Sequence, residues 1–276
     1  MDIDALLTEL VDLARREPSL SLWQFKTRVS GEQYRLLYEL IERHVPRGAA
    51  VLDWGCGNGH ASYALHALGY AAQAYSLDGA PPPLSAHLPD VRFTTGTDVV
   101  ALPYDDASFD AVLSVGVLEH VREEGGREVD SMREIRRILK PGGVFLCYHL
   151  PNRYSYIDAV AKVLPGTHHH EYRFTKRSIR ELCNAAGFDL IDAARYAAFP
   201  RNPWQIAPAA LANSKRVAAM WNAIDRMAAI PLAPIAQNYF FVARVTSSAP
   251  AADSAASAAD ASTSTRNAVT KDSFTA

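Results

Sequence analysis

The chain has 276 residues, of which 49% are hydrophobic and 21% are charged, as expected of a globular protein with one large domain or two small ones. Its 28 basic and 30 acidic side chains give a formal net charge of −2, which argues against a surface built to neutralise many nucleic-acid phosphates. Cys56, Cys147 and Cys183 stand far apart without a CxxC pair, so neither a disulfide scaffold nor a structural zinc site is expected. This cysteine usage predicts a cytoplasmic location.

No membrane insertion is expected. The N-terminus lacks the basic start and the uninterrupted apolar core of a signal peptide. The most apolar later stretch, residues 227–236, contains two prolines and is far shorter than the roughly 20 residues that span a bilayer.

Residues 1–45 are predicted to form a helical extension. Ile3, Leu6 and Leu10 recur at the spacing of one helix face. Ser30 followed by Gln33 fits a capping box that opens a second helix, and the Pro-Arg-Gly sequence at 46–48 ends it. Two roles are open for this extension: a lid over a functional site, or a cover for the outer edge of a sheet.

From residue 49, short apolar runs alternate with helical stretches. The predicted strands are residues 50–53, 72–77, 91–94, 109–114, 144–149, 188–193 and 239–245. The predicted helices are residues 59–68, 128–140 and 176–186, the last with Thr175 as its N-cap and Gly187 just past its end. This alternation predicts an α/β fold: a Rossmann-like, mostly parallel seven-stranded sheet with helices on both faces.

Two further segments differ from this pattern. Residues 196–237 are rich in Ala and Pro, contain Trp204 and Trp221, and are predicted to form a helical insertion before the last strand. Residues 247–276 consist mostly of Ala, Ser and Thr, which cannot bury enough apolar surface to offset their ordering entropy. We therefore expect a disordered tail after an α/β domain that spans residues 46–246.

The segment VLDWGCGNGHAS, residues 51–62, runs from a strand through a Gly-rich turn into a helix. Gly55, Gly57 and Gly59 allow the backbone to approach a ligand closely, and the helix directs its N-terminus at that ligand. In a parallel sheet this turn lies at the carboxyl edge, where ligands bind. A dinucleotide site would have its third glycine where His60 stands, and a Walker loop would need a Lys-Ser/Thr pair that is absent.

The remaining pattern, Asp-x-Gly-x-Gly-x-Gly, resembles the first motif of the class I S-adenosylmethionine-dependent methyltransferases. The resemblance covers residues 51–187 and implies S-adenosylmethionine as cofactor. Asp78 ends the second strand, where the family places an acid that accepts both ribose hydroxyls. Asp98 matches the acid that receives the adenine amino group, and the LKPGG sequence at 139–143 resembles the turn before the fifth strand.

Ten residues are the candidates for binding the cofactor. Asp53 ends an apolar strand, a costly place for a carboxylate without partners. Leu77 and Val99 would enclose the adenine ring, and each is otherwise an ordinary core residue. The full set is Asp53, Gly55, Cys56, Gly57, Gly59, Leu77, Asp78, Asp98, Val99 and Ser114.

Three histidines are the candidate catalytic bases. Methyl transfer is an in-line displacement, and a hydroxyl acceptor must also lose its proton. His120 follows the fourth predicted strand, His149 closes the fifth, and His168 begins the run of three histidines at 168–170. Each could instead be a hydrogen-bonded structural residue. The three consecutive histidines could not all bind one ion, because neighbouring side chains on an extended segment point to opposite faces.

The sequences LEHV and LPGTH are similar to the O-methyltransferases of quinone biosynthesis, which modify a catechol-type ring hydroxyl. Some of those enzymes hold a divalent metal around an ExxEH motif. Glu119 and His120 match the end of that motif, but Gly116 stands where its first Glu belongs, so no metal is expected.

The sequence thus predicts an enzyme that transfers a methyl group from S-adenosylmethionine to a small-molecule acceptor, most simply at a hydroxyl oxygen. The near-neutral charge makes nucleic acid an unexpected partner, and the oligomeric state is left open. The alternatives are a non-catalytic methyltransferase-like binding subunit and a methyltransferase that acts on protein or nucleic acid. A nicotinamide-dependent oxidoreductase is disfavoured by the position of the third glycine.

Overall fold

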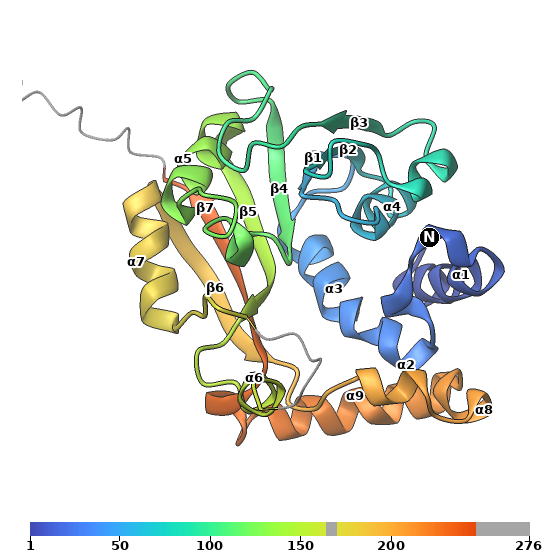
Figure 1. The fold of residues 1–276 in the computed structure, drawn as a ribbon. Helices are drawn as coiled ribbons and strands as arrows, with labels where there is room; N and C mark the ends of the chain where they lie inside the picture. The colour runs from blue at the N-terminus through green and yellow to red at the C-terminus, as the bar shows by residue number, and fades with distance from the viewer. Residues whose placement is uncertain (164–169, 247–276) are drawn as a thin grey trace, which may run out of the picture.

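The computed structural model describes residues 1–163 and 170–246, and its centre is one seven-stranded sheet in the order β3-β2-β1-β4-β5-β7-β6 (Figure 1). Six of the seven strands run in the same direction, and β7 runs opposite to them. The prediction of a mostly parallel sheet of seven strands is therefore confirmed. The strands are β1 (Ala50–Trp54), β2 (Ala71–Ser76), β3 (Arg92–Thr95), β4 (Phe109–Val115), β5 (Leu139–Pro151), β6 (Phe188–Tyr196) and β7 (Asn238–Val245).

Helices cover both faces of this sheet (Figure 1). Alternate strand residues face opposite sides: Val51 belongs to the core under α1, α3 and α4, whereas Leu52 belongs to the core under α5 and α7. The helices are α1 (Ile3–Arg16), α2 (Arg28–Gly31), α3 (Arg35–His44), α4 (His60–Ala67), α5 (Glu128–Ile138), α6 (Tyr156–Ala161), α7 (Lys176–Ala186), α8 (Ala209–Ala212) and α9 (Lys215–Ala229). Within the described ranges, none of them is long and apolar enough to cross a membrane.

Local capping signals explain several boundaries. Thr175 caps α7 in a capping box with Ser178, and Gly187 ends the helix in the left-handed conformation, both as predicted. The predicted box at Ser30 and Gln33 is wrong. Thr27 is the N-cap instead, because its side chain accepts the Ser30 N–H while the Ser30 hydroxyl accepts the Thr27 N–H.

The strand β5 begins five residues before its predicted start. The LKPGG segment at its beginning was expected to be a turn, but Leu139 pairs with Phe109 of β4. A register shift separates this pair from the regular ladder that starts at Val144, and Gly142 has a positive φ of 74°. The segment therefore has the irregular backbone of a turn, as expected, but it also pairs with the first residue of β4.

The helical extension and the helical insertion are both present, and they contact each other. The α8–α9 segment lies beside α2 (Figure 1). Glu32 is the centre of this contact, because its carboxylate accepts hydrogen bonds from Arg28, Arg35 and Asn222 of α9. The side chains of Arg28 and Glu32 are only 4% and 3% exposed, so this ion pair is screened little by solvent. Burial alone would raise the pKa of Glu32, but the two arginines lower it below its usual range. The tail predicted at 247–276 lies outside the described residues.

Candidate functional site

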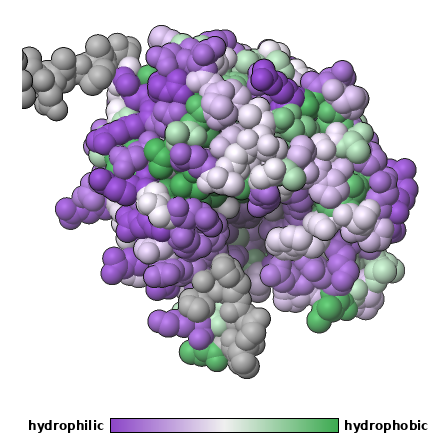
Figure 2. Space-filling model, turned by 45° about the horizontal axis from the view of Figure 1, so that its top comes forward, coloured by the Kyte–Doolittle hydropathy of each residue, from purple (hydrophilic) through white to green (hydrophobic). Residues whose placement is uncertain are grey.

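A cavity of about 640 Å³ lies at the carboxyl ends of the central strands. Its walls come from the turn after β1, the segment after β4, the end of β5, the N-terminal extension and the insertion. The space-filling view shows a hollow in this part of the surface (Figure 2). The carboxyl edge of a parallel sheet is where such folds bind ligands, so this cavity is the candidate active site.

The Gly-rich turn after β1 forms one wall. The N–H groups of Gly55 and Cys56 both donate to the carbonyl of Tyr75 on β2, which folds the chain back sharply. Gly55 has a φ of 70°, and a Cβ placed there would lie 2.6 Å from Cγ2 of Val117. Gly57 also has a positive φ, 49°, but a Cβ there would meet no atom within 4 Å. Gly55 is therefore required by close packing, and Gly57 by backbone conformation alone.

Asp53 stands at the base of this wall with 1% of its surface exposed. Burial raises the pKa of its carboxyl group to about 6, although a hydrogen bond from the Ser62 hydroxyl, 2.6 Å long, lowers the pKa in part. A carboxylate can accept several hydrogen bonds, so Asp53 has capacity for donors from a ligand in the cavity. Asp53, Gly55, Cys56 and Gly57 all line the cavity.

The other predicted cofactor residues lie outside the cavity lining. Asp78 and Asp98 are exposed in the loops after β2 and β3. Burial, together with the charges of Asp53 and Asp78, raises the pKa of the Cys56 thiol. The Asp98 carboxylate accepts the backbone N–H groups of Val100 and Ala101, which lower its pKa.

Leu77 is half-buried and Val99 is buried beside these loops. Gly59 caps α4 with a φ of 87° and packs near Pro82. Ser114 is fully buried within β4, and it is the next residue, Val115, that lines the cavity.

The predicted bases occupy unlike environments. The Nδ1 atom of His120 lies 2.8 Å from a carboxylate oxygen of Glu123, and the side chain is one-third exposed. His149 is half-buried with a φ of 67°, and desolvation of its ring lowers the pKa of that ring to about 3. Its Nδ1 lies 2.8 Å from the hydroxyl of Tyr196, which also accepts the His149 backbone N–H. His168 lies outside the described residues.

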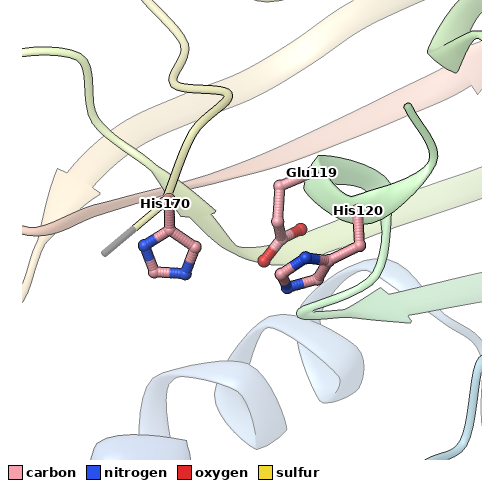
Figure 3. A group of neighbouring side chains, drawn as sticks. All are labelled: Glu119, His120 and His170. Atoms are coloured by element: carbon pink, nitrogen blue, oxygen red, sulfur yellow. The ribbon is translucent and has the colours of Figure 1, made fainter. Parts of the chain in front are cut away.

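Figure 3 shows a group that the sequence did not bring together: Glu119, His120 and His170. We call these three residues the His–Glu cluster. Their ligand atoms lie within 4.8 Å of one another, and all three line the cavity. Glu119 is 2% exposed, and burial raises its pKa to about 7. Nδ1 of His170 lies 3.2 Å from Oδ1 of Asp158, a residue with no distinguishing signal in the sequence.

Aromatic rings form the floor of the cavity. Tyr34 of the extension lies against His60 and His149, with ring centroids 4.3 Å and 5.2 Å apart. Tyr148 stacks on Tyr196 at 4.6 Å. Tyr196 ends β6 at the carboxyl edge, three residues past the predicted end of that strand at 193. A correct strand end would have marked it as a site residue.

Known proteins resemble this chain in sequence and in fold. A family model described as "Methyltransferase domain" matches residues 52–147. The Roseobacter denitrificans ubiquinone biosynthesis O-methyltransferase is 31% identical over 183 residues, which cover 60% of this chain and 69% of that protein. The chain belongs to the class I S-adenosylmethionine-dependent methyltransferases. The resemblance, the enzyme class and the cofactor predicted from sequence are thereby confirmed.

More distant proteins support the fold. The mouse EEF1A lysine methyltransferase 4 is 31% identical over 161 residues, covering 48% of this methyltransferase and 62% of the mouse protein. The structure of a Burkholderia thailandensis 1,6-didemethyltoxoflavin-N1-methyltransferase, determined with S-adenosylhomocysteine, has a TM-score of 0.50 and 23% identity over 77% of each chain. A Methanosarcina mazei S-adenosylmethionine-dependent methyltransferase has a TM-score of 0.51 at 16% identity, covering 75% of this chain and 96% of that one.

Two glycine substitutions test the packing of the turn. Gly55→Ala places a methyl group against Val117 as well as in a left-handed conformation, so we expect the free energy of unfolding to fall by about 3 kcal/mol or more. Gly57→Ala suffers the conformational cost alone and should lose about 1–2 kcal/mol. Urea unfolding followed by circular dichroism measures both. Equal losses in the two variants would show that the contact with Val117 is unimportant.

Proposed function

We propose that this methyltransferase transfers the methyl group to a hydroxyl oxygen of a small molecule bound in the cavity. The observation that carries the proposal is the cavity itself. It places the Gly-rich turn of the cofactor motif on one wall and the His–Glu cluster on another. Its volume of about 640 Å³ falls within the range typical of small-molecule sites, about 300–1,000 Å³. The ubiquinone biosynthesis O-methyltransferases among the relatives support an oxygen acceptor.

The cofactor would lie along the carboxyl edge of β1, β2 and β3. Asp53, Gly55, Cys56 and Gly57 would contact its methionine end, with Gly59 directing the N-terminus of α4. Asp78 would accept the ribose hydroxyls. The adenine would bind at Asp98 between Leu77 and Val99, while Ser114 would support the turn from β4. Because the residues proposed to bind adenosine lie outside the cavity lining, most of the cavity would remain for the methyl donor's sulfur and the acceptor.

Residues 1–45 and 196–237 would complete the acceptor site around the catalytic domain at 46–246. Both segments contribute lining residues, among them Tyr34 and Arg201. The hydrogen bond from Asn222 to the buried Glu32 fixes the two segments against each other, so they would enclose the acceptor and exclude water. An enclosed site of this kind favours a small acceptor over a protein or nucleic-acid chain.

Two histidines would then have different roles. In the reaction the acceptor oxygen attacks the methyl carbon, the carbon–sulfur electron pair stays on sulfur, and the acceptor's proton leaves through the His–Glu cluster, which contains His120. The pKa of the His149 ring is lowered, and its Nδ1 lies 3.2 Å from the Asn238 amide nitrogen, which can only donate, so we assign the ring proton to Nε2. We therefore assign His149 to hydrogen-bond donation that orients the acceptor, in place of the base predicted from sequence. His168 receives no role.

A labelled-methyl assay tests the proposed reaction. The protein is incubated with labelled S-adenosylmethionine and a panel of catechols, simple phenols, carboxylic acids and amines. We expect label in a phenolic or catecholic product whose mass increases by one methylene group. Transfer only to amines, or only to added protein or nucleic acid, would contradict a hydroxyl acceptor.

Asp78→Ala tests the placement of the cofactor. Each hydrogen bond from a ribose hydroxyl to a carboxylate stabilises by about 1.5–3 kcal/mol, so the affinity for S-adenosylhomocysteine should fall by about 10- to 100-fold or more. Asp90→Ala is the matched control, because Asp90 is an exposed carboxylate farther along the same connection. Isothermal titration calorimetry measures both. Unchanged affinity in Asp78→Ala would remove Asp78 from the site.

A further inference from the structure

The His–Glu cluster combines two segments that are far apart in the sequence. Glu119 and His120 lie in the short turn after β4, whereas His170 lies in the segment that leads to α7. Their side chains converge from opposite sides (Figure 3). One carboxylate and two imidazoles within 4.8 Å of one another form a ligand set of the kind found in catalytic zinc sites and in non-haem iron sites.

Both imidazoles are oriented by carboxylates on the same ring atom. Nδ1 of His120 lies 2.8 Å from Glu123, and Nδ1 of His170 lies 3.2 Å from Asp158. A carboxylate at Nδ1 favours the tautomer in which Nδ1 carries the proton and Nε2 carries the lone pair. Metal-binding histidines are usually held in this way. The carboxylate at Nδ1 fixes the orientation of the ring and makes Nε2 a stronger ligand.

One buried carboxylate oxygen in the cluster lacks a hydrogen-bond partner among the described residues. Oε2 of Glu119 is fully buried and has no hydrogen-bond partner among the described residues. An unpartnered carboxylate oxygen in such a place is costly, and a bound cation is one way to compensate it. The imidazole ligands favour a transition-metal ion over Mg²⁺ or Ca²⁺, which prefer oxygen ligands throughout.

We propose that Glu119, His120 and His170 bind one divalent transition-metal ion of the Zn²⁺ type, with its remaining coordination positions open to the cavity. Three protein ligands leave at least one such position, as in catalytic zinc sites. All three residues line the cavity, so the acceptor's oxygen could occupy that position. With the ion bound, His120 and His170 would serve as ligands and not as bases, and the cluster would promote loss of the acceptor's proton through the ion. A hydroxyl bound to the ion has a lower pKa and can release its proton to water in the cavity. This last step rests on the proposed function, whereas the metal site itself does not.

Metal binding is measured directly on untagged protein that has been stripped with a chelator. Equilibrium dialysis against Zn²⁺ followed by elemental analysis should give one equivalent per chain, and Co²⁺ should produce the visible absorption bands of a nitrogen- and oxygen-ligated ion. Glu119→Gln and His170→Gln should each weaken Zn²⁺ binding by at least 100-fold, and Asp158→Asn by about 10-fold or more. Less than one equivalent in the unmodified chain would overturn the site.

His87→Gln is the matched control. His87 also pairs with a carboxylate, at 3.0 Å from Glu17, but it lies on the surface away from the cavity. This variant should bind Zn²⁺ as the unmodified chain does. Retained S-adenosylhomocysteine binding in Glu119→Gln and His170→Gln shows that they are folded, and wild-type Zn²⁺ affinity in both would overturn the proposal.

The two proposals fail separately. One tightly bound Zn²⁺ without methyl transfer to any hydroxyl would leave the metal site and remove the hydroxyl acceptor. Methyl transfer to a hydroxyl at an equal rate in metal-free and Zn²⁺-loaded protein would keep the acceptor and overturn the catalytic use of the ion.

Discussion

The contact between Gly55 and Val117 determines where the site can form. As the chain leaves β1, Gly55 takes a positive φ and its Cα approaches the Val117 side chain after β4 so closely that a Cβ has no room. β1 and β4 are parallel neighbours, so their carboxyl ends share one edge of the sheet, and this close approach packs the segments that follow them against each other. It brings the cofactor motif on β1 and the His–Glu cluster after β4 to the same cavity.

A second constraint shapes the other side of the cavity. The buried carboxylate of Glu32 joins Arg28 and Arg35 of the extension to Asn222 of the insertion. Removing one member of such a network leaves a buried charge without a partner, which is far more costly than losing a surface ion pair. The walls of the cavity are therefore held by a specific polar contact as well as by apolar packing.

The parts of the fold that depend on local signals could be predicted from the sequence. The strand–turn–helix pattern at Asp53 and the cap at Thr175 each depend on residues a few positions apart, and the structure has both where they were expected. The wrong capping box shows the limit of such signals. Thr27 and Ser30 are both able to cap a helix, and the choice between them is made by their mutual hydrogen bonds within the buried extension.

The His–Glu cluster could not be predicted, because it depends on contacts between distant segments. The prediction of no metal depends on Gly116, which breaks a local motif, whereas His170 lies about fifty positions farther along the chain and gives no signal in that motif. His170 was known only as one of three consecutive histidines. His170 joins the cluster because Asp158 orients its ring and because the chain returns past the end of β4. Neither feature has a sequence signature.

The central claim is that the Gly-rich turn and the His–Glu cluster face each other across one methyl-transfer site. A crystal structure of the protein with S-adenosylhomocysteine tests this claim most directly. Our account predicts that the sulfur atom lies beside the turn from Gly55 to Gly57 and faces the cavity, with the ribose at Asp78. A sulfur atom that faces away from the cavity, or a cofactor bound elsewhere, would contradict it.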